Sequence, residues 1–198
     1  ILDGRRRFQG KAFWSGRSQI ALRLLTREEV PVDDDFFADR LRRAAALRER
    51  IFPGEPAVRL VHGEADLLPG LVVDRYGKAA VLQTLVPGTE RRKDFLADLL
   101  AGAFGMEAVL ERNDVRVREL EGLPQEKGIL RGGDPGPVEY REGTVRMTLD
   151  LLSGQKTGAF LDQRENRKIL AGLVSGRTVL DCFSYTGGFS ISCLRGGA

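Results

Sequence analysis

The sequence predicts an α+β domain in the middle of the chain, preceded by a short all-β segment and followed by the start of a doubly wound α/β domain. The middle part mixes short alternating strands with amphipathic helices, which is typical of α+β domains. Residues 178–194 combine an apolar strand, an acid, a glycine pair and the start of a helix, the order found where an open α/β sheet meets its ligand. We place the three units at residues 1–29, 30–150 and 151–198.

Composition excludes several classes of protein. The chain has 198 residues, of which 42% are hydrophobic and 30% charged, an ordinary globular composition with room for more than one small core. It contains no apolar run of transmembrane length and no leader pattern, so we expect a cytoplasmic protein without membrane contact. Cys182, Cys193 and the single histidine, His62, lack metal-ligand spacing, so we expect neither a disulfide framework nor a metal site.

The first unit and the helix that follows it are short. Residues 8–26 alternate as two strands around Gly16, which is too little for an independent barrel. A linker ending in three aspartates then caps a helix that runs to about residue 50. One face of this helix carries Phe37, Leu41, Ala44 and Ala45, and another carries Arg40, Arg43 and Arg50.

The middle domain is predicted from strand and helix periods. We expect strands at residues 57–61, 70–74, 79–85 and 107–111, with a helix at residues 93–104. Asn113 or Asp114 should cap a short helix that ends at Leu120. A hairpin across residues 142–143 should complete the domain, and the alternation of residues 145–149 predicts that it has one buried face.

The last unit begins with a predicted helix. Asp162 and Glu165 have the spacing of a capping box, and the helix should continue through Leu173. A strand at residues 178–181 and a helix from residue 189 should follow. A glycine pair before a helix is often only a tight turn, so this signal alone is weak. The capping box also leaves the polar side chains just before Asp162 unexplained.

The string from residue 154 to 167 gives the most specific signal. It reads Gly-Gln-Lys-Thr-Gly-Ala-Phe-Leu-Asp-Gln-Arg-Glu-Asn-Arg. It resembles the bacterial large-subunit ribosomal RNA cytosine-5 methyltransferases of class I fold that carry an N-terminal PUA domain, and only Ala159 departs noticeably from the family's form. Residues 18–26, 59–77 and 111–123 are also similar to segments of that family, so the resemblance spans essentially the whole chain.

The resemblance implies a fold and a cofactor. The fold would be an α+β central domain, preceded by a partial PUA β-barrel and followed by the start of a Rossmann-like methyltransferase domain that binds S-adenosyl-L-methionine (SAM). The residues that it implies for the cofactor turn are Asp181, Phe183, Ser184, Tyr185, Thr186, Gly187 and Gly188. Lys156, Thr157, Phe160 and Gln163 are implied as further, weaker candidates for the cofactor pocket.

Methylation of carbon 5 of cytosine needs a nucleophile. In the family a cysteine adds to carbon 6, and that cysteine lies beyond the end of this sequence, as does most of the catalytic sheet. We therefore expect the 198 residues to be an inactive fragment that also lacks part of the PUA domain. Cys182 and Cys193 are poor candidates for the nucleophile because an isolated cysteine is most often a small buried hydrophobe. His62 lies in a turn-rich loop and is expected to be structural.

The resemblance names 23S ribosomal RNA as the partner and is compatible with a homodimer. Arginine accounts for most of the basic residues, and its planar fork suits phosphates and stacked bases. Arg40, Arg43 and Arg50 are the candidate RNA contacts. The net charge of only +3 by itself favours a solvated surface instead.

Two alternatives stay open, and a third is weaker. The chain could belong to a SAM-dependent enzyme with a different target base, because the sequence contains no catalytic motif that would identify the base. It could also be a non-catalytic RNA-binding module. A dinucleotide-dependent dehydrogenase is disfavoured, since no Gly-x-Gly-x-x-Gly follows Asp181.

Overall fold

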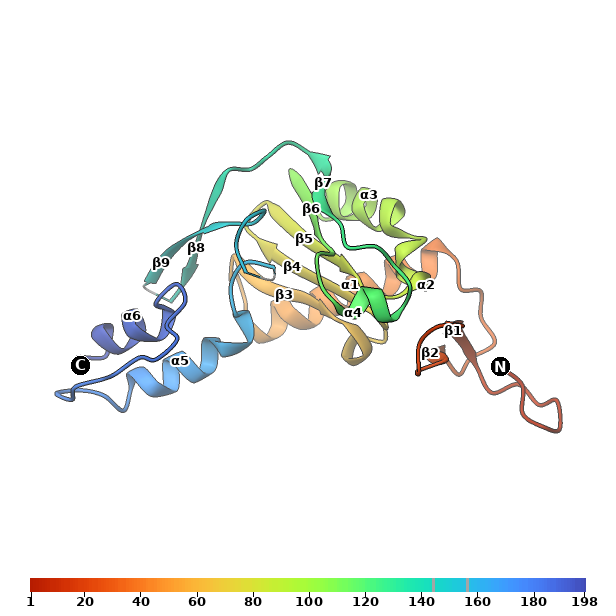
Figure 1. Cartoon of the computed structure of the whole chain (residues 1–198), viewed down its shortest axis with the longest axis horizontal. Helices are drawn as coiled ribbons and strands as arrows, with labels where there is room; N and C mark the ends of the chain where they lie inside the picture. Colours follow the sequence, from red (N-terminus) through yellow and green to blue (C-terminus); the bar gives the residue numbers. More distant parts are fainter. Residues whose placement is uncertain (144, 156) are drawn as a thin grey trace.

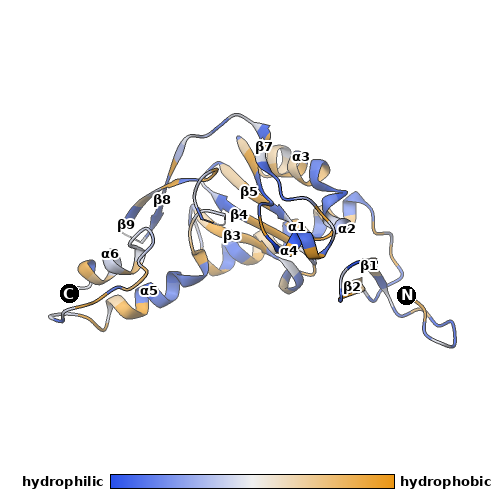
Figure 2. Ribbon diagram, viewed as in Figure 1, coloured by the Kyte–Doolittle hydropathy of each residue, from blue (hydrophilic) through white to orange (hydrophobic). Residues whose placement is uncertain are grey.

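The computed structural model describes residues 1–143, 145–155 and 157–198. The molecule is elongated, and Figure 1 shows a central sheet with the N-terminal hairpin at one end and two C-terminal helices at the other. Hydrophobic colour is concentrated along the central strands in Figure 2, whereas much of α5, near the C-terminus, is hydrophilic. The sheet therefore provides the core, and the other elements are attached to it.

The N-terminal hairpin consists of β1 (Lys11–Trp14) and β2 (Leu22–Thr26), paired antiparallel. These are the two strands expected around Gly16. The hairpin packs on the central domain through Phe13, whose ring stacks on that of Phe37 with 6.1 Å between centroids. A barrel is not formed by the described part of this segment, so the PUA assignment of residues 1–29 stays a prediction.

Helix α1 (Asp34–Ile51) follows the predicted pattern closely. Asp33 is its N-cap, and the carboxylate accepts a hydrogen bond of 3.1 Å from the Phe36 amide. Phe37, Leu41 and Ala44 are buried against the sheet, as their helical spacing predicts. Opposite them lies a polar face, which leaves most of the helix's arginines in contact with water.

The central sheet has the strand order β3-β4-β5-β6-β7. The strands are β3 (Ala57–His62), β4 (Leu71–Tyr76), β5 (Ala79–Thr84), β6 (Ala108–Arg112) and β7 (Lys127–Gly132). Pairing is antiparallel except between β5 and β6, which run parallel because α2 (Pro87–Glu90) and α3 (Lys93–Ala103) carry the chain back along the sheet. Helices α1 and α3 cover one face. The short η1 (Gly63–Asp66) connects β3 to β4.

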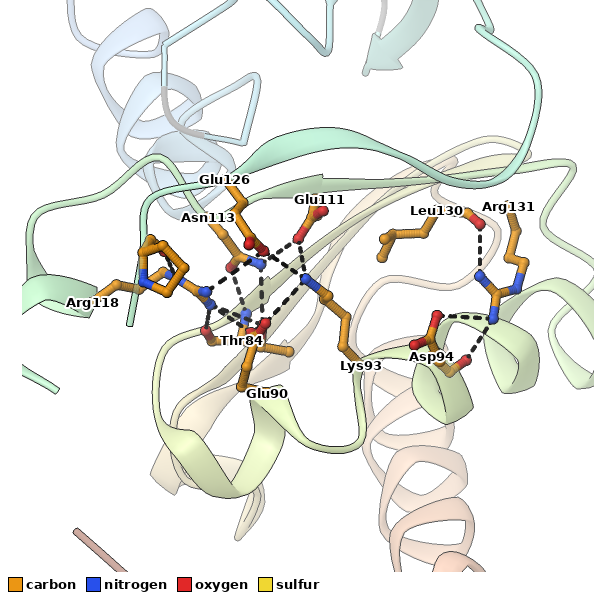
Figure 3. A network of polar contacts seen from close by, with 11 residues as sticks. Thr84, Glu90, Lys93, Asp94, Glu111, Asn113, Arg118, Glu126, Leu130 and Arg131 are labelled. Carbon is orange, nitrogen blue, oxygen red and sulfur yellow. Dashed lines mark hydrogen bonds and ion pairs between the residues drawn. The ribbon is translucent and has the colours of Figure 1, made fainter. Parts of the chain in front are cut away.

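A network of polar side chains lies between α2, α3 and the last strands (Figure 3). The Asn113 side chain accepts a hydrogen bond of 2.8 Å from the Thr84 amide and donates one of 2.8 Å to Glu111. Asp114 instead pairs with Arg112. The prediction that one of these two residues caps α4 (Val117–Leu120) was therefore wrong. A buried backbone amide needs a hydrogen-bond acceptor, and an Asn or Asp side chain can supply one either to a helix end or to another segment. Here the Asn113 side chain accepts from the Thr84 amide and is not available to cap α4.

The second face of the sheet is covered by the hairpin of β8 (Pro137–Glu142) and β9 (Val145–Asp150). Tyr140 and Leu149 pack against Tyr76, and the Tyr76 and Tyr140 rings meet edge to face at 5.7 Å. Val145 and Leu149 are buried while Arg146 and Thr148 are exposed. The predicted hairpin and its single buried face are confirmed.

The C-terminal part contains η2 (Leu161–Gln163), α5 (Arg164–Ala171) and α6 (Gly188–Arg195). The predicted capping box was wrong, because the Asp162 carboxylate accepts from the Gln163 side chain and a 3-10 turn precedes the helix. Helix α5 also ends at Ala171, before the expected Leu173. Its buried side chains are Arg164 and Arg167, whereas Ile169 is 62% exposed.

Residues 178–181 do not form the predicted strand. All four are described, and Leu180 is 87% exposed. A strand is held by hydrogen bonds to a neighbouring strand, and no described segment pairs with these residues. The helix expected from residue 189 is present as α6. Among the described residues, none of the helices is long and apolar enough to cross a membrane, and no group of side chains has the make-up of a metal site.

Candidate functional site

A small pocket of about 120 Å³ lies where the C-terminal turn meets the rest of the chain. Its walls come from the β8–β9 hairpin, from residues 159–163, from α5 and from residues 183–189. The pocket is lined by Tyr140, Met147, Ala159, Phe160, Gln163, Arg167, Phe183, Ser184, Tyr185, Thr186, Gly188 and Phe189. Two segments that are about 20 residues apart in the sequence, residues 159–163 and 183–189, thus line one cavity.

The turn from Phe183 to Gly187 has an unusual backbone. Phe183 and Tyr185 adopt left-handed φ values of 64° and 50°, and Gly187 has a φ of 74°. The Gly187 amide donates a hydrogen bond of 2.8 Å to the Ser184 carbonyl, which closes the turn. Left-handed conformations cost energy for residues with a Cβ, and such strain is concentrated at binding sites. The turn therefore has a defined, hydrogen-bonded conformation and is not an irregular loop.

Helix α6 begins directly at this turn. Its N-cap is Gly187, which has no side chain that could accept hydrogen bonds from the first amides of the helix. Gly188 and Phe189, in the first turn, line the pocket. The first amides of a helix lack intrahelical partners and favour negative charge. An anionic group of a ligand in this pocket would find donors here.

Asp181 lies outside the pocket lining. Its Oδ2 accepts hydrogen bonds from the Ser190 amide at 3.1 Å and from the Ser190 hydroxyl at 2.6 Å. The carboxylate thus faces the first turn of α6 and borders a separate hollow with Thr178 and Cys193. In this arrangement Asp181 holds the helix against the chain that precedes it.

Tyr185 joins the turn to the string that begins at residue 154. Its hydroxyl accepts a hydrogen bond of 3.0 Å from the Gln155 amide and donates one of 3.4 Å to the Gly158 carbonyl. Its ring meets that of Phe160 edge to face, with 5.7 Å between centroids. Phe160 and Gln163 both line the pocket beside this turn.

Thr157 points elsewhere. It is 1% exposed, and its hydroxyl donates to Oδ2 of Asp74 in the central sheet. The Thr157 side chain is thus occupied by the central domain and does not line the pocket. Lys156, another predicted cofactor residue, lies outside the described residues.

Arg167 was missed as a site residue by the sequence analysis. It is 5% exposed and pairs with Glu142 of the hairpin through two bonds, of 2.7 and 2.5 Å. Both terminal nitrogens also donate to the Phe160 carbonyl at 3.2 Å. The sequence feature that points to Arg167 is its position as the last residue of the 154–167 string, whereas the helix prediction rested on the apolar residues of that segment.

Tyr140 forms the floor of the pocket beside Met147, and its hydroxyl lies 2.8 Å from the Met147 sulfur. Burial raises the pKa of Tyr140 to about 12, with the nearby Glu142 acting in the same direction. Tyr140 is therefore neutral at physiological pH. Together with Phe160 and Tyr185 it gives the pocket an aromatic wall, beside the guanidinium of Arg167.

The other candidate residues are dispersed. Arg40 is half-buried, donates to the Leu67 carbonyl and lies over the Phe36 ring at 4.2 Å. Burial lowers the pKa of Arg40, and the charge of Arg43 adds to this effect. Arg43 is exposed and pairs with Asp39, and Arg50 is exposed. Of the three arginines on this face of α1, Arg40 is half-buried because its side chain packs on the Phe36 ring and bonds to the Leu67 carbonyl, whereas Arg43 and Arg50 are exposed.

The two cysteines and the histidine also lie apart from the pocket lining. Cys193 is 2% exposed within α6, as a core cysteine should be, and Cys182 is exposed. His62 is exposed at the end of β3.

Comparison with known proteins finds similar sequences and similar folds. Residues 129–198, which include every segment of the pocket, match the model of one protein family. It is the family of S-adenosylmethionine-dependent methyltransferases. The chain is 42% identical over 99% of its length to "Ribosomal RNA large subunit methyltransferase I" of Shewanella denitrificans, and 39% identical over its whole length to the protein of the same name from Photobacterium profundum. The Vibrio cholerae protein of that name is 41% identical over 95% of the chain.

The match to these homologues is partial on their side. The chain spans about half the length of the curated relatives it matches, 50% of the Shewanella protein and 51% of the Photobacterium protein. Solved structures show the same fold. A protein described as a SAM-dependent methyltransferase from Streptococcus mutans superimposes on the whole chain with a TM-score of 0.83 at 23% identity, using 51% of its own length. A methyltransferase structure complexed with SAH gives the same score and coverage at 24% identity.

Proposed function

We propose that the protein is a SAM-dependent methyltransferase that modifies the RNA of the large ribosomal subunit. The observation that carries this proposal is the match of 42% identity over 99% of the chain to a protein named for that activity. The geometry supports it independently, because the pocket combines the predicted turn at residues 183–188 with Phe160 and Gln163.

The residues around the pocket fit SAM in kind. SAM carries a carboxylate, and the amides of Gly188 and Phe189 at the start of α6 are suited to hold it, whereas the next amide, that of Ser190, is bonded to Asp181. It also carries a flat base, for which Phe160, Tyr185 and the fully exposed Phe183 offer aromatic surfaces. When bound, SAM would supply an activated methyl group. The protein's own residues would bind it, orient it and keep the turn in its strained form.

For the target base we propose carbon 5 of cytosine in 23S ribosomal RNA, on the strength of the resemblance of the 154–167 string to that family. The nucleophile would then be a cysteine other than Cys193, which is buried in α6, and Cys182, which does not line the pocket. Methylation of a different base is the second candidate.

The unit assignment is part of the same proposal. Residues 1–29 would belong to a PUA-like RNA-binding domain, residues 30–150 to the central domain and residues 151–198 to the SAM-binding domain. Contact with RNA is proposed for α1, where Arg43 and Arg50 are exposed, with Arg40 as a half-buried neighbour. A ribosomal RNA substrate would place the protein in the cytoplasm, and a homodimer remains an expectation from the resemblance.

The deciding experiment is methyl transfer by the intact protein. Purified protein, SAM with a labelled methyl group and unmodified large-subunit RNA are incubated, and the RNA is digested to nucleosides for mass spectrometry. Labelled 5-methylcytidine supports the full proposal. Label on another nucleoside supports the second candidate, and absence of both label transfer and SAM binding would contradict the proposal.

A further inference from the structure

The described residues of the string, 154–155 and 157–160, lie between two parts of the molecule and make hydrogen bonds to both. On one side, the Gln155 amide and the Phe160 ring contact Tyr185 of the pocket turn. On the other side, the Thr157 hydroxyl donates to Asp74, and the Ala159 amide donates to the Tyr76 hydroxyl at 2.9 Å. The string therefore connects the central sheet to the pocket turn by side-chain hydrogen bonds.

The two anchors in the sheet are matched in spacing to the string. Asp74 and Tyr76 are two residues apart on β4, so both point to the same face of the sheet, toward the β8–β9 hairpin. The positions that they bind, Thr157 and Ala159, are also two residues apart. Both bonds can therefore form at one alignment of the string with the strand, and a shift by one residue would remove the threonine hydroxyl from Asp74.

The Asp74 carboxylate is held in place by hydrogen bonds within the sheet, independently of the string. It is completely buried, and it accepts two hydrogen bonds of 2.9 Å from Arg59, its direct neighbour across β3 and β4. A buried carboxylate needs such partners, because an unpaired one costs several kcal/mol. The Thr157 hydroxyl adds a third donor to the carboxylate. Asp74 is thus a rigid anchor, positioned by the sheet and not by the string.

We infer that Asp74 and Tyr76 of the central domain are positioning residues for the cofactor pocket, acting through Thr157 and Ala159. This inference rests on the proposed function and extends it. Asp74 and Tyr76 do not line the pocket. Through their bonds to Thr157 and Ala159 they fix the position of the string, and with it the position of the Phe160 ring against Tyr185. A change at these anchors is transmitted to the turn that binds SAM.

The test uses one threonine and a matched control. Thr157→Val removes the hydroxyl with almost no change of shape, and Thr157→Ser restores it. The control is Thr89→Val, since Thr89 is also fully buried and its hydroxyl bonds to backbone carbonyls far from the pocket. SAM affinity is measured by calorimetry on the intact protein, well below the melting temperature of each variant.

Thr157→Val should weaken SAM binding by roughly threefold to tenfold, as expected when one hydrogen bond that holds the string is removed. Thr157→Ser should restore the affinity. Thr89→Val should lower the melting temperature and leave the affinity unchanged. Equal SAM affinity in wild type and Thr157→Val would overturn the inference, as would an equal loss in Thr89→Val.

Amide hydrogen exchange separates this inference from the proposed function. Without any ligand, residues 183–189 should exchange faster in Thr157→Val than in the wild type or in Thr89→Val. If the wild type does not bind SAM, the proposed function fails, yet this exchange difference still tests the link. Unchanged exchange in the turn would show that the anchors do not control it.

Discussion

Arg167 of α5 and Glu142 of β8 form a bidentate ion pair that is largely buried. The Nε–Oε1 and Nη2–Oε2 distances are 2.7 and 2.5 Å, and the two side chains are 6% and 9% exposed. The same guanidinium donates to the Phe160 carbonyl and lies 5.8 Å from the Phe189 ring. One side chain thus joins the hairpin, the string and α6 around the pocket.

Removing one partner of this pair should be costly. We expect Arg167→Met to lower the free energy of unfolding by about 3–5 kcal/mol, because Glu142 is left as an unpaired buried charge. Denaturant titration measures the loss. The double variant Arg167→Met with Glu142→Leu should recover much of it, and Arg195→Met, at the end of α6 and outside this pair, should have little effect. Equal stability of the single variant and the wild type would mean that the pair is open to water.

Gly187 should be required because of its left-handed backbone conformation and not because a side chain would clash with its neighbours. A Cβ at this position would have its nearest neighbour 4.0 Å away, but the φ of 74° costs roughly 1–2 kcal/mol for a residue with a side chain. Gly187→Val should therefore distort the turn and weaken SAM binding by about tenfold or more, a free-energy loss of about 1.4 kcal/mol or more. Calorimetric titration is the measurement.

Gly188 offers the comparison for this variant. It is helical, and an added Cβ would meet the Arg167 and Met147 side chains at 3.4 and 3.5 Å, which is ordinary contact. Gly188→Ala should fold normally and change the SAM affinity less than Gly187→Val does. A Gly187→Val protein that is folded and binds SAM with wild-type affinity would remove the turn from the proposed site.

The arginines of α1 should separate by their contacts. Arg43→Gln with Arg50→Gln should keep the wild-type stability, because exposed ion pairs contribute little. If these residues bind phosphates, the double variant should bind ribosomal RNA more weakly, and the slope of log affinity against log salt should fall by roughly one unit for each phosphate that is no longer neutralised. Unchanged affinity and slope would identify a merely solvated surface.

Arg40 should behave differently, because it holds the Leu67 carbonyl and covers the Phe36 ring. Arg40→Gln should lower the melting temperature whether or not RNA is present. A thermal scan of the three single variants, Arg40→Gln, Arg43→Gln and Arg50→Gln, distinguishes this structural contribution from RNA binding.

Glu90 should make the central domain sensitive to acid. Burial alone would raise its pKa, but hydrogen bonds from Arg118, Thr84 and Lys93 outweigh this and lower the pKa to about 2 (Figure 3). A lowered carboxyl pKa stabilises the fold at pH values above the ordinary value of 4.5, and this contribution is lost as the pH falls toward 2. Glu90→Gln should therefore be less stable than the wild type at pH 6, and the difference should shrink between about pH 4.5 and pH 2. Urea titrations at several pH values measure this, and a constant difference would contradict the assignment.

Neither cysteine of the chain should be needed for methyl transfer. Cys182→Ser in the intact protein should retain the wild-type rate, since the thiol is exposed and outside the pocket lining. Cys193→Ser should retain the chemistry but lower the melting temperature, because a hydroxyl replaces a buried thiol. Loss of transfer in a folded Cys182→Ser protein would assign the nucleophile to this turn.

Local pattern determined most of the helices and strands. The face of α1 that carries Phe37 and Leu41, its cap in the aspartate run and the one-sided hairpin at residues 137–150 follow from period and turn chemistry, which act over a few residues. The glycine turn before α6 was likewise predictable from sequence, and the structure places its side chains with Phe160 and Gln163.

Side-chain partners outside the predicted roles, near or far along the chain, decided the rest. Asn113 and Asp162 have the right types and positions for helix caps, but Asn113 bonds to Thr84 and Asp162 to the neighbouring Gln163 side chain. Thr157, predicted beside the cofactor, is bound to Asp74, 83 residues away in the sequence. A polar side chain takes the partner that the folded chain brings within reach, and a strand such as residues 178–181 needs a neighbour for its hydrogen bonds. The sequence around such a residue or strand does not reveal which partner tertiary packing will supply.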